Sequence, residues 1–391
     1  MRHLHPISQS ILTWITGKPL NVKEFSLILP RWLDVVVTPI LAVLAVAALV
    51  RLSTIGTPLA WIAIIALWLL LVGQLRKMQV THMHHAIHNR LFNRALINKI
   101  YANLIPALLF IQNASEYRKE HLEHHNAKIF TTKLDSDAAF LAKIGFIPGR
   151  TKSELWMNLW ITIFSPVFHL FFAKTRLTST FLRAKPSTIL MSIIATCGYA
   201  TLLIALGWKT FLIAILVPLF PLYHISALFQ FLTEHAWNVV SEPVLDYGHY
   251  AERCWGRFCG ETFPEYIPGS GIISTVRFSR RVVVWALKML FLHLPTRVAC
   301  LVSDLPAHDW HHLAHLAGQN SRDWQRSFYL RQAAIENGDI AGFAKRELWG
   351  MPRMITHQFA SLESIVCHYE QPRTKLSKVR EMGTLNKGEI K

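Results

Sequence analysis

The sequence predicts an all-α integral membrane protein with four transmembrane helices in two hairpins. Apolar residues make up 52% of its 391 residues and charged residues only 17%, and the mean hydropathy is +0.28, which is unusual for a soluble chain. Long uncharged stretches occur in two pairs, and a short turn joins the members of each pair. Histidines gather just outside these stretches. The chain therefore combines a membrane anchor with a histidine-rich site at its edge.

The charge balance argues for a membrane surface and against nucleic acid. Lys and Arg number 41 and Asp and Glu 24, but the basic residues flank apolar segments and no base-reading module accompanies them. Such flanking charge is typical of the cytoplasmic side of a membrane protein. The five cysteines are an odd number and irregularly spaced, which favours a reducing compartment over a disulfide framework. No nucleic-acid partner is expected.

The first predicted hairpin covers residues 32–75. Residues 1–31 precede it as a cytosolic or interfacial segment without the apolar core of a cleaved signal peptide. The stretch 35–50 carries no charge and, with the residues before it, approaches the roughly 20 that a spanning helix needs. A turn at 54–58 leads into a second uncharged run, which ends at the basic pair Arg76 and Lys77.

Residues 76–185 are predicted to be a cytosolic region with interfacial helices. The uncharged stretch 100–115 is short and contains Pro106, so we expect it to lie at the membrane surface. The stretch 155–173 is long enough to cross, although Pro166 lies inside it.

The second predicted hairpin covers residues 186–233. Pro218 and Pro221 should kink its second arm, because proline removes a backbone donor. Residues 234–370 form a second cytosolic region, in which the apolar patch 282–300 is interrupted by charge. Residues 371–391 are expected to be a mobile tail.

Three histidine clusters indicate one metal site. Residues three and four apart share a face of a helix, so the members of each cluster project together. Imidazole is a good ligand for iron, zinc and copper, and a nitrogen-rich set favours redox or Lewis-acid chemistry. One such pair is usually a surface feature, but three clusters beside apolar segments are a strong signal. The clusters are His84 and His88; His121, His124 and His125; and His308, His311 and His312.

In two of the clusters, the histidines that bind metal can be chosen in more than one way. His82 and His85 offer another pair beside His84. In the third cluster His311 could pair with His315, although the choice that includes His308 reproduces the spacing of the second cluster.

The clusters also constrain the topology, since ligands of one site lie on one side of the bilayer. No crossing is needed between the first and second clusters, and the hairpin 186–233 supplies two between the second and third. A single crossing by 155–173 would split the site unless 282–300 also crossed, with Lys288 in the bilayer at a cost of several kcal/mol. Both segments are therefore predicted to be interfacial, and the clusters to share the basic, cytosolic face.

With these three clusters and two hairpins, the chain resembles the membrane fatty acid desaturase family over about residues 30–320. The three clusters are similar to its histidine boxes, and the stretch from Tyr117 to His125 followed by Asp135-Ser-Asp137 is similar to its second box. The resemblance implies a non-haem di-iron centre with two Fe2+, four spanning helices and a cytosolic helical cap that carries the boxes. The family often has a proline soon after its third box, where this chain has Ala317 and Gly318.

The resemblance also implies further site residues. His235 occupies the place of a ninth ligand, and Asp137 and Asp309 are the preferred carboxylates to hold ligand rings. His224 lies about 16 Å deeper by helical rise, too far to bind the same iron. It either lines an acyl tunnel or is a hydrogen-bonded histidine of the helix bundle.

The predicted activity is O2-dependent desaturation of a fatty acyl or other lipid chain. No His-Pro-Gly-Gly segment of a fused haem domain occurs, so two electrons should come from a separate ferredoxin- or cytochrome-type donor. A di-iron hydroxylase or ketolase acting on a lipid or carotenoid is the alternative enzyme. A non-catalytic membrane metal carrier would need ligands along a path through the spans, where only His224 lies deep. The size of the chain and the lack of a fused donor favour a bacterial inner membrane over the endoplasmic reticulum.

Overall fold

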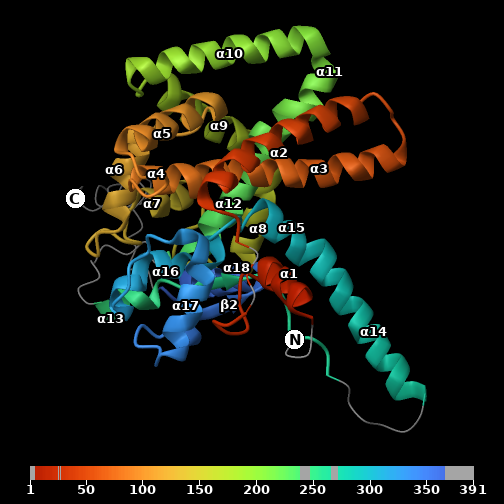
Figure 1. Ribbon diagram of the computed structural model, residues 1–391, viewed down its shortest axis with the longest axis vertical. Helices are drawn as coiled ribbons and strands as arrows, with labels where there is room; N and C mark the ends of the chain where they lie inside the picture. Colours follow the sequence, from red (N-terminus) through yellow and green to blue (C-terminus); the bar gives the residue numbers. More distant parts are fainter. Residues whose placement is uncertain (1–4, 25, 27, 238–246, 266–271, 366–391) are drawn as a thin grey trace, which may run out of the picture.

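The fold is almost entirely helical (Figure 1). The structure, a computed structural model, describes residues 5–24, 26, 28–237, 247–265 and 272–365. The predicted mobile tail 371–391 lies outside the described residues, as do short parts of the predicted region 234–370. The all-α prediction is confirmed, with two three-residue strands as the exception among the described residues.

The elements follow one another along the chain with short connections. The α-helices are α1 (Pro6–Thr16), α2 (Arg31–Leu52), α3 (Pro58–Lys77), α4 (His84–Ile87), α5 (Ala95–Leu109), α6 (Ala114–His124), α7 (Ser136–Lys143), α8 (Lys152–Phe164), α9 (Pro166–Phe181), α10 (Pro186–Leu206), α11 (Trp208–Phe211), α12 (Tyr223–Glu234), α13 (Tyr247–Glu252), α14 (Ile272–Lys288), α15 (Leu294–Ala299), α16 (His308–Leu313), α17 (Ser327–Glu336) and α18 (Met351–Ser364). The π-helical turns are η1 (Met78–Met83), η2 (Leu212–Leu216), η3 (Pro218–Leu222) and η4 (Met289–His293). The 3-10 turns are η5 (Leu305–Ala307), η6 (Ala314–Ala317), η7 (Trp324–Arg326) and η8 (Phe343–Arg346), and the strands are β1 (Gly256–Phe258) and β2 (Glu347–Trp349).

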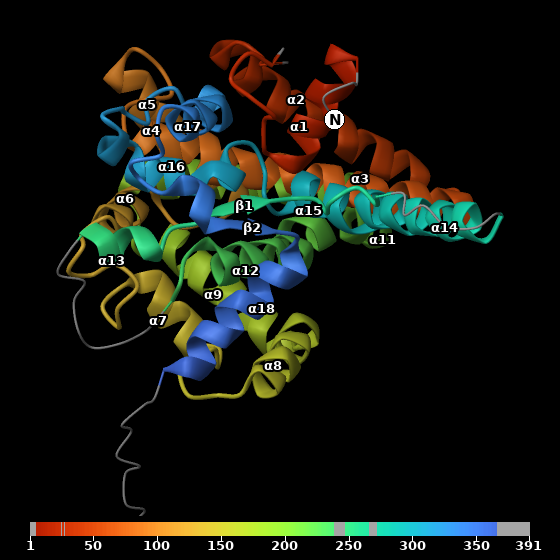
Figure 2. The same ribbon diagram turned by 90° about the horizontal axis from the view of Figure 1, so that it is seen from below.

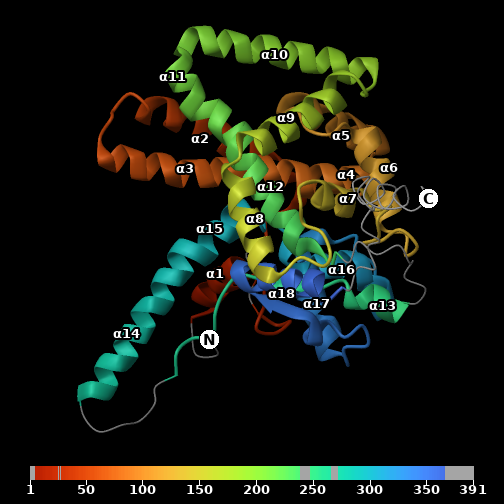
Figure 3. The ribbon, with the colours of Figure 1, turned by 180° about the vertical axis from the view of Figure 1, so that it is seen from behind.

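Two helical hairpins project from the same side of the molecule (Figures 1 and 3). The first consists of α2 and α3, and the second of α10 and the run from α11 to α12. The second arm of the second hairpin is irregular at η2 and η3, around Pro218 and Pro221, because each proline lacks the N–H that a regular turn would use. Their outer surfaces are rich in exposed apolar side chains, which suits helices that face lipid.

Among the described residues, five helices are long and apolar enough to cross a membrane. Four of them are the arms of the two hairpins, and the fifth runs from Ile273 to Ala299. Two bent pairs would raise the number to seven: α5 with α6, bent by 108°, and α8 with α9, bent by 69° at Pro166. The protein is therefore built around apolar, membrane-compatible helices.

The helix Ile273–Ala299 differs from the short apolar patch expected at 282–300. The patch is the second half of a continuous helical run through α14, η4 and α15. Lys288 does not interrupt it, because its ammonium group is exposed and bonds the Glu261 carboxylate at 2.9 Å.

Close packing joins the end of this helix to the first hairpin. A Cβ atom on Gly73 would lie 2.0 Å from the carbonyl oxygen of Val298, so only glycine fits between α3 and α15. Beyond α15, the short parallel sheet of β1 and β2 lies between α16 and α12 (Figure 2). Arg257 of β1 is fully buried and donates to the carbonyl oxygens of Gln230 in α12 (3.4 Å) and Leu305 (3.0 Å). The sheet thus fixes the third histidine cluster against the second hairpin.

Candidate metal centre

The first histidine cluster lies where α3 continues through the π-helical turn η1 into α4. His84 faces the rings of the other two clusters, whereas His82 and His85 point elsewhere. His82 bonds Asp34 at 2.9 Å, and His85 bonds Asp304 at 3.0 Å. The first cluster is therefore divided between two histidines that bond carboxylates and the pair His84 and His88, which meets the other clusters.

The second cluster ends α6, and the third forms α16. Asn113 caps α6 by accepting from the backbone N–H of Glu116 at 3.0 Å, and the helix then presents His121, His124 and His125 at its last turn. Helix α16 is held by Asp309, whose carboxylate accepts from the Arg331 guanidinium at 2.9 Å. Both residues are almost fully buried, so this ion pair fixes the orientation of α16.

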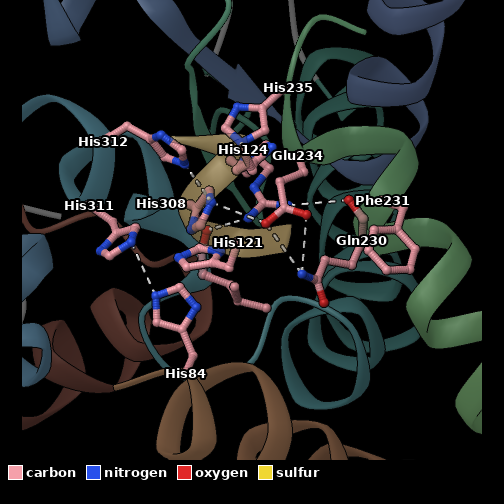
Figure 4. A network of polar contacts seen from close by, with 12 residues as sticks. His84, His121, His124, Gln230, Phe231, Glu234, His235, His308, His311 and His312 are labelled. Atoms are coloured by element: carbon pink, nitrogen blue, oxygen red, sulfur yellow. Dashed lines mark hydrogen bonds and ion pairs between the residues drawn. The ribbon is translucent and has the colours of Figure 1, made fainter. Parts of the chain in front are cut away.

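Two groups of ring nitrogens form where the clusters meet (Figure 4). The first group consists of His84, His88, His121 and His311, whose nearest nitrogens all lie within 4.8 Å of one another. The Nε2 atoms of His84 and His311 are 3.1 Å apart. His125 adjoins this group, with its Nε2 atom 3.0 Å from those of both His121 and His311.

The second group consists of His124, His235, His308 and His312, together with the Glu234 carboxylate. The Nε2 atoms of His124 and His235 are 3.1 Å apart, as are those of His308 and His312. Glu234 lies 3.1 Å from the Nε2 atom of His308. The two groups adjoin, since the rings of His125 and His312 stack with their centroids 4.3 Å apart.

The donor set fits bound metal ions. Where the Nδ1 atom of a neutral histidine carries the proton, its Nε2 lone pair is free, and two such lone pairs about 3 Å apart repel unless a cation lies between them. Nitrogens that share a metal at bonds of about 2.0–2.1 Å have this separation. Buried Nε2 of His88 has no partner among the described residues, as expected of an atom reserved for a ligand.

Partners at Nδ1 orient several rings. The Asp135 carboxylate lies 2.8 Å from the Nδ1 atom of His124. The Tyr250 hydroxyl lies 2.8 Å from that of His312, and the Tyr117 hydroxyl 3.2 Å from that of His84. A carboxylate can only accept, so Asp135 favours the Nδ1–H form of His124 and leaves its Nε2 atom for a metal, while the two hydroxyls orient their rings.

The preferred carboxylates of the sequence prediction lie differently. Asp137 is within reach of His124, but Asp135 makes the hydrogen bond to the ring. Asp309 bonds Arg331 and the backbone N–H of Trp310, so it orients the helix rather than a ring. Both differences arise because spacing along the chain cannot show which way a carboxylate points.

Burial and the neighbouring rings keep most of the histidines neutral in the metal-free protein. Burial, followed by the repulsion that neighbouring imidazoles would exert if several were charged together, lowers the pKa of His125, His308, His311 and His312 well below the usual value. Burial also acts on His124, but the Asp135 carboxylate outweighs it and raises the pKa of His124 to about 9. A neutral ring is the form that binds metal.

His235, the predicted ninth ligand, and His224, predicted to lie deeper, have different positions. His235 follows the end of α12 and joins the second group. His224 is buried outside both groups, and its Nε2 atom lies 2.9 Å from the Arg176 guanidinium. This contact is the kind that the second of the two roles, a hydrogen-bonded histidine of the bundle, would make, and both roles stay predictions.

Asp135 and Glu234 were candidates among the acidic residues but not the preferred ones, and the tyrosines Tyr117 and Tyr250 were not foreseen as ring partners. Tyr117 could have been found, because it lies one helical turn before His121 on the same face of α6. No signal marks Tyr250, which comes from a distant segment.

These features define a class of helical proteins with membrane-compatible helices and a histidine-rich site that could hold metal ions. The family model for fatty acid desaturases matches residues 59–262, and the chain belongs to this family. The match includes the first two clusters and His235 but ends before the third cluster. Membership implies a membrane oxidoreductase that acts on lipids. Searches of the curated proteins and of the solved structures each gave no match.

Proposed function

We propose that the protein is an O2-dependent desaturase of fatty acyl chains with a di-iron centre. The supporting observation is the convergence of nine histidines from distant segments into two adjoining groups, with facing nitrogens 3.0–3.1 Å apart. Two groups suit two metal ions. The proposed ligands are His84, His88, His121, His124, His125, His235, His308, His311 and His312.

When bound, two Fe2+ ions supply the oxidising chemistry with O2. Overall, the segment –CH2–CH2– loses two hydrogens and becomes –CH=CH–, while O2, two electrons and two protons, together with those hydrogens, form two molecules of water. The electrons come from a ferredoxin- or cytochrome-type donor.

The chain's own residues prepare the site for this reaction. Asp135, Tyr117 and Tyr250 hold three of the rings in fixed orientations. Five of the nine proposed ligands are buried and the other four partly buried, which limits the access of bulk water and so protects the reaction from side reactions. A cavity beside the histidines gives the substrate access.

We propose that four helices cross the membrane, as the arms of two hairpins. The meeting of all three clusters at one place supports this topology, since any further single crossing would separate them. Arg277, Arg280 and Arg281 are exposed on α14, which suits a helix at the surface of an anionic membrane better than one inside it. The site then lies on the cytosolic face, in a helical cap formed by 76–185 and 234–370. We place the protein in a bacterial inner membrane.

Metal and product analysis test this proposal. The chain purified from a host with defined lipids should hold about two irons, and His312→Ala should lose iron and activity. The exposed His315→Ala serves as the matched control. Loss of two hydrogens from the lipid supports a desaturase, and gain of oxygen would instead identify the hydroxylase or ketolase. One zinc without iron would identify a metal-binding membrane protein.

A further inference from the structure

Two adjoining chambers lead to the histidines. The inner chamber, of about 70 Å³, is lined by His84, His121, His124 and His308. The outer chamber, of about 240 Å³, leads away from them. Seven residues line both chambers, among them Arg76, so they form one passage.

The inner chamber is polar. Only Val80, Phe231 and Leu305 contribute apolar side chains to its wall, which otherwise consists of the histidines and other polar residues. A cavity that holds only methylene groups is usually lined by apolar side chains, because a polar wall would lose its hydration without gaining partners. The outer chamber has a more apolar wall, to which Ile111, Phe140 and Phe172 contribute. The passage is therefore polar at the metal end and more apolar further out.

Arg76 lies at the junction of the chambers. Only 1% of its surface is exposed, and its side chain contacts the Tyr223 ring at 4.9 Å. It donates to the side-chain oxygens of Gln79, at 2.7 Å, and of Gln230, both of which are neutral. Among the described residues no carboxylate pairs with it, and its buried Nε–H has no hydrogen-bond partner. An unpaired buried guanidinium is costly, so the site is complementary to an incoming oxygen.

The other cations of the passage already have partners. Arg176 donates to the backbone carbonyl oxygens of Leu109, Phe110 and Leu219. Arg183 pairs with Glu116 at 2.9 Å. Three carboxylates line the inner chamber: Glu120 accepts from the amide of Gln112 at 2.7 Å, Glu234 lies 3.1 Å from His308, and Asp137 lies within reach of His124. Arg76 is thus the cation of this wall with a buried donor left over.

We infer that the substrate enters with a compact carbonyl-type oxygen, such as a carboxylate, which accepts from Arg76, while its hydrocarbon tail lies in the outer chamber. This inference rests on the proposed function for the identity of the reaction. The inner chamber is small, about 70 Å³, so the carbons beside the histidines are those close to the oxygen-bearing end. A coenzyme A or phospholipid head group is too large for this space. The oxidised carbons should therefore lie near the carboxyl end rather than in the middle of the chain.

Binding can be tested without turnover. The purified holoenzyme is loaded with radiolabelled decanoate, and unlabelled decanoate, decane and decanoyl-CoA compete for the site. Decanoate should displace the label at least about ten-fold better than either competitor, because a hydrogen bond to a charged group contributes that much or more. Arg76→Met should weaken decanoate binding about ten- to hundred-fold. Arg51→Met, at the far end of the first hairpin, is the matched control and should bind normally.

The outcomes separate this inference from the proposed function. Iron content and thermal unfolding show whether Arg76→Met is folded, and if it is not, the wild-type competition alone decides. Equal displacement by decane or by decanoyl-CoA would overturn the inference, as would products oxidised in the middle of the chain. An iron-loaded protein that prefers decanoyl-CoA retains the proposed function. A protein without iron that still selects decanoate through Arg76 retains the inference and loses the function.

Discussion

The two histidine groups differ in their charged neighbours, although their sequence spacings are alike. In the first group, His84 has a tyrosine hydroxyl at its Nδ1 atom. In the second group, Asp135 bonds His124 and Glu234 lies beside His308. Carboxylates make the ligands of the second group more basic and offset the charge of a cation. Similar ligand patterns are thus given different metal affinities by the residues around them, and we expect the second group to bind its metal more tightly.

Removal of one ligand from each group should give the largest effect. We expect His84→Ala and His124→Ala each to lower the iron content from about two to about one per chain and to abolish activity, because a buried group cannot recruit a replacement ligand. Metal analysis of the purified variants measures this. The control is His315→Ala, and iron loss in that variant would instead favour the pairing of His311 with His315.

Loss of the Arg331 side chain should affect stability rather than a particular group. Arg331→Met leaves the buried Asp309 carboxylate without its partner, and we expect a loss of about 3–5 kcal/mol in the free energy of unfolding. Denaturant unfolding in detergent measures this loss. Normal stability with weaker iron binding would show that Asp309 acts on the metal site directly.

Loss of the Asp135 charge should weaken the second group selectively. Asp135→Asn should lower the metal affinity of that group about 10- to 100-fold, the usual effect of losing a carboxylate that orients a ligand ring. Competition with a chelator measures the affinity. Asp137→Asn is the matched control with a smaller expected effect, and the reverse order would restore the sequence-based preference for Asp137.

The tyrosines should give the smallest effects. Tyr117→Phe and Tyr250→Phe each remove one neutral hydrogen bond, which contributes about 0.5–1.5 kcal/mol, so metal affinity should fall about two- to ten-fold. The same chelator competition should show the change at the first group for Tyr117 and at the second for Tyr250. A change at the other group would mean that the groups do not act separately.

Much of the fold could be predicted from the sequence, because uncharged stretches and basic ends directly reflect the membrane. The family resemblance was confirmed, and so was the helical membrane class. The length of the helix Ile273–Ala299 was underestimated, because a lysine with an exposed ammonium group and a carboxylate partner does not end a helix. The number of spanning helices depends on which apolar helices cross, and apolar composition alone does not decide this.

The site was harder to predict at the level of single residues. Helical spacing selected the pair His84 and His88, but it could not show that His82 and His85, in and just after the π-helical turn Met78–Met83, bond Asp34 and Asp304. Whether Asp135 or Asp137 holds the ring depends on the turn before α7. There Asp135 both caps the helix and bonds His124. Such roles arise from contacts between distant segments, which spacing does not encode.

The close approach of Gly73 to Val298 has a consequence for how the molecule can vary. Gly73 lies eleven residues before His84, and Val298 ten residues before His308. A single backbone contact therefore sets the register between the chain segments that lead into the first and third clusters. A side chain larger than hydrogen at residue 73 would push α3 and α15 apart. It would thereby separate two metal-binding segments without contacting either of them. The absence of a side chain at residue 73 is therefore a condition for assembling the site.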